Sequence, residues 1–65
     1  MTEFDRGVLF AVCIIMFGRT DTTIAGDVLV NAGLADADVS GMFEGSDIDT
    51  IAKCNTDSRI NLRGL

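Results

Sequence analysis

The run from Gly7 to Phe17 places eleven uncharged, almost wholly apolar residues in succession. If this run is helical, its side chains from Val8 onward fall on every side of the helix, and such a helix has to be covered all round. Fewer than fifty residues follow it, enough to cover one or two faces but not the full circumference. The uncovered part predicts either a homodimer or a groove for a partner.

The ends of this run favour a helix over a strand. A β-strand from Val8 to Phe17 is the alternative, because β-branched and aromatic residues are frequent in the run. However, Thr2 and Asp5 have the spacing of a capping box at the amino end. Gly18 is the expected left-handed cap at the other end. We therefore predict a helix from about Glu3 to Phe17.

The same run could be mistaken for a targeting segment. It is too short to span a bilayer, which takes about 20 apolar residues. A signal peptide needs a positive flank, whereas Glu3, Asp5 and Arg6 precede this run. We therefore expect a buried helix and no membrane segment. Cys13 and Cys54 are expected to be free thiols in a cytosol, with one disulfide in an oxidising compartment as the alternative.

Two shorter helices are predicted further along the chain. The second runs from about Thr22 to Ala32, is capped by Asp21 or Thr20, and ends at Gly33, with Leu34 making a hydrophobic contact after the cap. The third runs from Asp47 to about Cys54, where Ser46 with Asp49 repeats the capping pattern.

The remaining segments are a loop and a tail. Residues 35–46 read as a polar loop, with one helical turn around Val39 to Phe43 and with Met42 and Phe43 folded onto the core. The tail from Arg59 to Arg63 alternates polar and apolar residues, which is typical of a strand. It either pairs with its copy in a dimer or lies extended over the core. Residues 1–65 are thus expected to form one all-α domain, a small three-helix domain with an extended C-terminal tail.

Acidic residues dominate the middle of the chain. Ten acids oppose five bases overall, for a net charge of −5, and no base at all lies between Thr20 and Ala52. Carboxylates along a rigid surface can imitate a row of phosphates and bind a basic groove; the alternative is a solvated face. Direct nucleic-acid binding is excluded, because phosphate contacts need basic side chains. The predicted partner-binding residues are Asp21, Asp27, Asp36, Asp38, Glu44, Asp47 and Asp49.

Catalysis and metal binding find little support. The chain has no histidine, tyrosine or tryptophan and one lysine, so we expect no enzyme, no catalytic residue and no cofactor. The segment Asp36–Asp47 partly follows the calcium-loop pattern, with Gly41 at the turn. Its last position holds Asp where that loop needs Glu, and Gly33 interrupts the entering helix. A degenerate calcium-binding module therefore stays an alternative, with no metal ligand assigned.

Three segments carry a resemblance to a known class of proteins. Phe4–Ala11, Thr23–Leu29 and Ala32–Leu34 resemble small phage-encoded accessory proteins of the anti-CRISPR type. The resemblance implies an inhibitor in the cytoplasm of a bacterial host, bound to a basic, nucleic-acid-binding surface of a defence effector such as a CRISPR complex. It carries over no functional residue. The alternative is a structural or regulatory homodimer joined through the first helix and the tail.

Overall fold

Helix α1, Glu3–Arg19, begins at the predicted capping box. In the computed structural model, which describes residues 1–65, the Asp5 backbone N–H donates to the Thr2 hydroxyl at 3.1 Å, and the Thr2 N–H donates to the Asp5 carboxylate at 3.4 Å. The predicted end at Gly18 is wrong. Gly18 stays helical, and Thr20 takes the left-handed conformation with φ 52°. Thr20 can do so because its hydroxyl and its N–H both donate to the Met16 carbonyl, which would otherwise lack a partner at the helix end.

Helix α2, Thr22–Asn31, has both of its predicted caps. At its start, the Asp21 carboxylate accepts a hydrogen bond from the Ile24 N–H at 3.0 Å. At its end, Gly33 has φ 74°. The Leu34 N–H donates to the Leu29 carbonyl at 2.8 Å, and the Gly33 N–H donates to the Val30 carbonyl at 3.1 Å. This is the Schellman arrangement, and it turns Leu34 back into the core.

Helix α3, Ser46–Ala52, is shorter than predicted and continues as the 3₁₀-helix η1, Lys53–Thr56. The predicted cap of Ser46 with Asp49 is wrong, because Ser46 is already the first helical residue. Gly45 occupies the cap position with φ 57° and ψ −131°, a conformation that only glycine adopts readily. The helix therefore begins at a glycine turn and has no side-chain cap.

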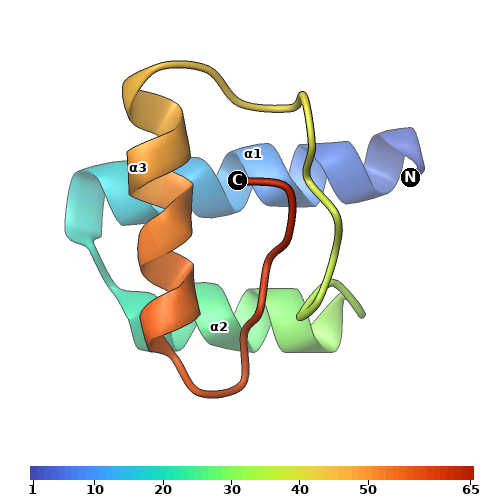
Figure 1. The fold of residues 1–65 in the computed structure, drawn as a ribbon. Helices are drawn as coiled ribbons and strands as arrows, with labels where there is room; N and C mark the ends of the chain where they lie inside the picture. The colour runs from blue at the N-terminus through green and yellow to red at the C-terminus, as the bar shows by residue number, and fades with distance from the viewer.

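The axes of the three helices follow two directions (Figure 1). Helices α1 and α2 lie side by side and run in opposite directions, and α3 crosses them. Both the loop after α2 and the tail add side chains to the core between the helices, as predicted for Phe43. No helix reaches the length and apolarity that crossing a membrane requires. The core consists of Leu9, Val12, Cys13, Met16, Ala25, Leu29, Leu34, Val39, Phe43, Ile51, Cys54, Ile60 and Leu62.

The tail pairs with the loop of its own chain. Residues 61–63 run parallel to residues 35–39 and form one isolated bridge, Asp38 with Arg63, so the chain contains no β-strand. The tail thus satisfies its hydrogen bonds without a second copy, and it lies over the core. Three backbone hydrogen bonds join the two segments. The Asn61 N–H donates to the Ala35 carbonyl at 2.7 Å, and the Arg63 N–H donates to the Ala37 carbonyl at 2.9 Å. The Val39 N–H donates to the Arg63 carbonyl at 2.8 Å.

The opposite edge of the tail is held by one side chain, Asn55. Its amide nitrogen donates to the Leu62 carbonyl at 3.1 Å, and its amide oxygen accepts from the Leu62 N–H at 2.8 Å. The tail is therefore bonded on both edges, and Ile60 and Leu62 point into the core. The observed fold confirms a small all-α three-helix domain with an extended tail.

Candidate protein-binding surface

One side of α1 is left uncovered, as the apolar run predicted. Its core side carries Leu9, Val12, Cys13 and Met16, which are buried. The other side carries large apolar side chains that are half or more exposed: Phe4 at 74%, Phe10 at 50%, Ile14 at 72% and Phe17 at 76%. Exposed apolar patches of this kind mark binding surfaces in proteins that are otherwise polar outside.

A hollow of about 290 Å³ opens on this side, next to the start of α3. One wall is fixed, because the Phe10 ring packs edge-on against the Phe43 ring, with centroids 5.5 Å apart and planes at 67°. We call this site the α1–α3 hollow. It is lined by Phe10, Cys13, Ile14, Phe17 and Asp47.

Asp47 is the one charged group in the α1–α3 hollow. The only two ion pairs in the chain both use Arg59, so the Asp47 carboxylate has no basic partner. Burial, and to a lesser degree the Asp47 charge, raises the pKa of the Cys13 thiol. The floor of the hollow is therefore an uncharged thiol, and its rim carries an unpaired negative charge.

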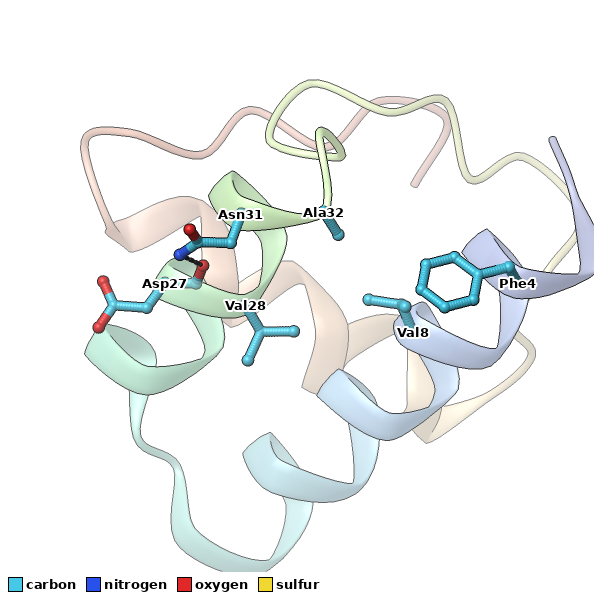
Figure 2. A pocket seen from close by; sticks show the side chains of 6 residues that line it. All are labelled: Phe4, Val8, Asp27, Val28, Asn31 and Ala32. Atoms are coloured by element: carbon cyan, nitrogen blue, oxygen red, sulfur yellow. Dashed lines mark hydrogen bonds between the residues drawn. The ribbon is translucent and has the colours of Figure 1, made fainter.

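A second, wider hollow of about 560 Å³ lies on the other side of α1. We call it the α1–α2 hollow. Figure 2 shows Phe4 and Val8 of α1 pointing toward Val28 of α2, with Asp27 on the outer side of α2. The Asp27 carboxylate accepts a hydrogen bond from the Arg59 guanidinium at 2.7 Å, so the charge of Asp27 is already balanced. The α1–α2 hollow thus lacks the free charge that the α1–α3 hollow has. Asn31 and Ala32 complete its lining.

The seven predicted partner-binding acids do not share one role. Three carboxylates are engaged within the chain: Asp21 caps α2, Asp27 pairs with Arg59, and Asp38 accepts bonds from the Ser40 N–H and hydroxyl, which lower the Asp38 pKa. Asp47 is the one acid with a free carboxylate that lines a hollow. The other four of the seven are exposed and have no hydrogen bond to their carboxylates inside the chain: Asp36, Glu44, Asp47 and Asp49.

Two tail arginines reduce the negative charge of the middle segment. Arg59 lies along α2, where it bonds Asp27 and also Asp57 at 2.7 Å. It can lie so close because Gly26 has no side chain: a Cβ there would come within 2.5 Å of the Asp57 carboxylate and 2.7 Å of the guanidinium. The sequence shows no base between Thr20 and Ala52, so this contact with a base further along the chain was not predicted. A glycine in the middle of a helix was the available signal, since it often marks a close approach.

The second arginine, Arg63, reaches the loop. Its Nε donates to the Asp36 carbonyl at 3.0 Å, and its charge contributes to the low pKa of Asp38. The same loop belongs to the segment Asp36–Asp47, whose sequence partly follows the calcium-loop pattern. The Asp38 carboxylate is turned onto Ser40, and no three histidine, cysteine or acidic side chains converge anywhere in the chain. The calcium-binding alternative gains no ligand set from the geometry.

Comparison with protein-family models, with curated proteins and with solved structures finds no match to this chain.

Proposed function

We propose that this protein acts by binding another protein, and that the α1–α3 hollow is its contact site. The observation that carries the proposal is an apolar hollow with an unpaired carboxylate at its rim. Its occupant is an apolar side chain on a basic segment of the partner. A basic segment is favoured because no lysine or arginine lines the hollow, and Glu44 and Asp49 carry further free carboxylates on the same stretch of chain.

Affinity and association rate come from different parts of this surface. Phe17 and Ile14 are largely exposed, so covering them removes apolar area from water. A buried aromatic anchor of this kind contributes about 2 kcal/mol or more, about 30-fold in affinity. Asp47 contributes mainly to the association rate and to selectivity, because exposed charges steer the encounter and are screened by salt.

The resemblance to phage-encoded anti-CRISPR proteins supplies the partner class to test first. In this proposal the protein is a stoichiometric inhibitor in the cytoplasm of a bacterial host. It binds a basic surface by which a CRISPR effector holds nucleic acid, and it works by occupying that surface and not by catalysis. Such surfaces are rich in arginine and lysine, which fits a site with an acidic rim.

Capture from bacterial lysate, followed by binding and cleavage assays with the purified partner, tests the proposal. We expect a partner that is retained at low salt and released at high salt. Phe17→Ser should weaken its binding about 30-fold, and Asp47→Asn should slow association and reduce the salt dependence. If the partner is a CRISPR effector, the wild-type protein should also block target cleavage at a one-to-one ratio.

Matched controls separate the hollow from the general surface. Ile24→Ser removes an exposed apolar side chain on α2, outside both hollows, and Asp36→Asn removes an exposed carboxylate of the loop after α2 that lines neither hollow. Both controls should bind like the wild type. Equal retention by Phe17→Ser and the wild type, or equal loss in the controls, contradicts the proposal.

A further inference from the structure

A seam of exposed residues with coiled-coil spacing runs along the outward face of α1. Its members alternate steps of three and four along the helix, which is the spacing of the two contact positions in a heptad repeat. All five are exposed, so nothing in the chain covers them. The α1 seam consists of Phe4, Gly7, Ala11, Ile14 and Gly18.

The two glycines of the seam are not required by the chain's own packing. Neither has the positive φ that favours glycine, and the space where a Cβ would stand is open at both Gly7 and Gly18. Glycine inside a helix is less stable than alanine, so these two positions lower the stability of α1. No contact within the chain offsets this loss. The two glycines do allow another helix to approach closely.

We propose that the α1 seam binds α1 of a second copy of this chain, with the two helices antiparallel and Ala11 at the two-fold axis. In this register Phe4 of one copy lies over Gly18 of the other, and Ile14 lies over Gly7. Large side chains thus fill the spaces above small ones, as knobs fill holes. A parallel pair would place Phe4 against itself and leave Gly18 facing Gly18.

Charge favours the same direction. The first turn of α1 carries Glu3 and Asp5, and its last turn carries Arg19. An antiparallel pair brings the acidic start of one helix near the basic end of the other, and it also opposes the two helix dipoles. A parallel pair would place acids beside acids.

The available area is sufficient for a specific contact. Phe10 and Phe17 flank the seam, each one position before a seam residue, Ala11 and Gly18. From their exposed fractions, and at about 200 Å² for a whole aromatic side chain, these two rings and Phe4 expose about 400 Å² in each copy. Two copies therefore bring about 800 Å² from these rings alone. Ile14 and Ala11 raise the total to about the 1,000 Å² that a specific interface needs.

The dimer goes beyond the proposed function and does not depend on it. Ile14 of the α1 seam and the flanking rings of Phe10 and Phe17 also line the α1–α3 hollow, so self-association and partner binding compete. The free protein is then a dimer that opens when a partner takes the hollow.

Sedimentation of the purified protein without any partner tests the dimer. We expect a concentration-dependent dimer for the wild type. Ala11→Glu should give a monomer with unchanged helicity, because two carboxylates would meet at the axis. Val30→Glu, which adds the same charge at an exposed apolar position of α2 outside both hollows, should leave the dimer intact. A wild type that is monomeric at millimolar concentration overturns the proposal, as does a dimer that Ala11→Glu leaves unchanged.

Cysteine cross-linking tests the direction. Under mild oxidation Ala11→Cys should link two copies through the axis, whereas Gly18→Cys should not, because the two Gly18 positions lie at opposite ends of an antiparallel pair. The native Cys13 and Cys54 are buried free thiols and serve as the background in both variants. Efficient cross-linking of Gly18→Cys would show a parallel pair and overturn the proposed register.

Discussion

Replacing Asn55 by alanine tests how the tail is held. The Asn55 amide makes two hydrogen bonds to the Leu62 backbone, at 2.8 and 3.1 Å, on the edge that the loop does not reach. Alanine removes both bonds. Since Leu62 is 3% exposed, its N–H and carbonyl would then lack partners at the edge of the core.

Two energies decide what the tail does in this variant. Leaving a buried polar group unpaired costs about 1–3 kcal/mol, so the Leu62 N–H and carbonyl together cost about 2–6 kcal/mol. Detaching the tail would expose Ile60 and Leu62, at about 1.5–3 kcal/mol for each side chain, and would also break the three backbone hydrogen bonds to the loop, at about 1 kcal/mol each. Because detachment costs more, we expect the tail to stay docked and Asn55→Ala to lower the free energy of unfolding by about 2 kcal/mol or more. That is a large fraction of the total for a chain of this length, which is about 3–10 kcal/mol.

Urea unfolding and amide hydrogen exchange measure the two parts of this prediction. Asn61→Ala is the matched control, because the Asn61 side chain makes no hydrogen bond within the chain, and it should stay within about 0.5 kcal/mol of the wild type. In Asn55→Ala the Leu62 amide should lose protection, while the amides of Asn61 and Arg63 keep theirs. Unchanged stability together with a protected Leu62 amide would refute the reasoning.

Four further outcomes follow from the core and the charged contacts. Leu29→Ala should lower the free energy of unfolding by about 3 kcal/mol in urea titration, since Leu29 is fully buried. Gly26→Ala should stabilise an Arg59→Ala background by about 1 kcal/mol through helix propensity, but stabilise the wild type less, because there the new methyl also pushes apart the ion pair of Arg59 with Asp57; equal gains in the two backgrounds would contradict this. Arg59 holds the pKa of Asp57 at about 2, below its ordinary 3.8, so thermal scans should show stability falling as the pH drops from about 4 to 2. Burial raises the pKa of Cys54 from 9.0 to about 11, so stability should also fall as the pH rises from about 9 to 11, and Cys54→Ala should remove that loss.

The parts of the fold that depend on neighbouring residues could be predicted from sequence. The capping box of Thr2 with Asp5 and the Asp21 and Gly33 caps of α2 are local patterns, and all are present. The helix ends that were predicted wrongly also depend on neighbouring residues, but at these ends more than one residue can act as the cap. Thr20 closes α1 with its own hydroxyl, so Gly18 was not needed as the cap.

The candidate site depended on contacts between distant segments, which no local pattern encodes. The uncovered apolar side of α1 was foreseen from the count of apolar residues against the length of the chain. The pairing of Asp27 with Arg59 joins residues 32 apart and was missed. As a result, a segment that is wholly acidic in sequence is partly balanced in space, and Asp47 alone lines a hollow with a free carboxylate.

The contact of the tail with the loop also governs how this chain folds. Arg63 reaches Asp36 across 27 positions, so the last core residues join only after a long loop has closed. Folding rate falls as such non-local contacts increase, and this all-helical protein should fold more slowly than a bundle joined by short turns.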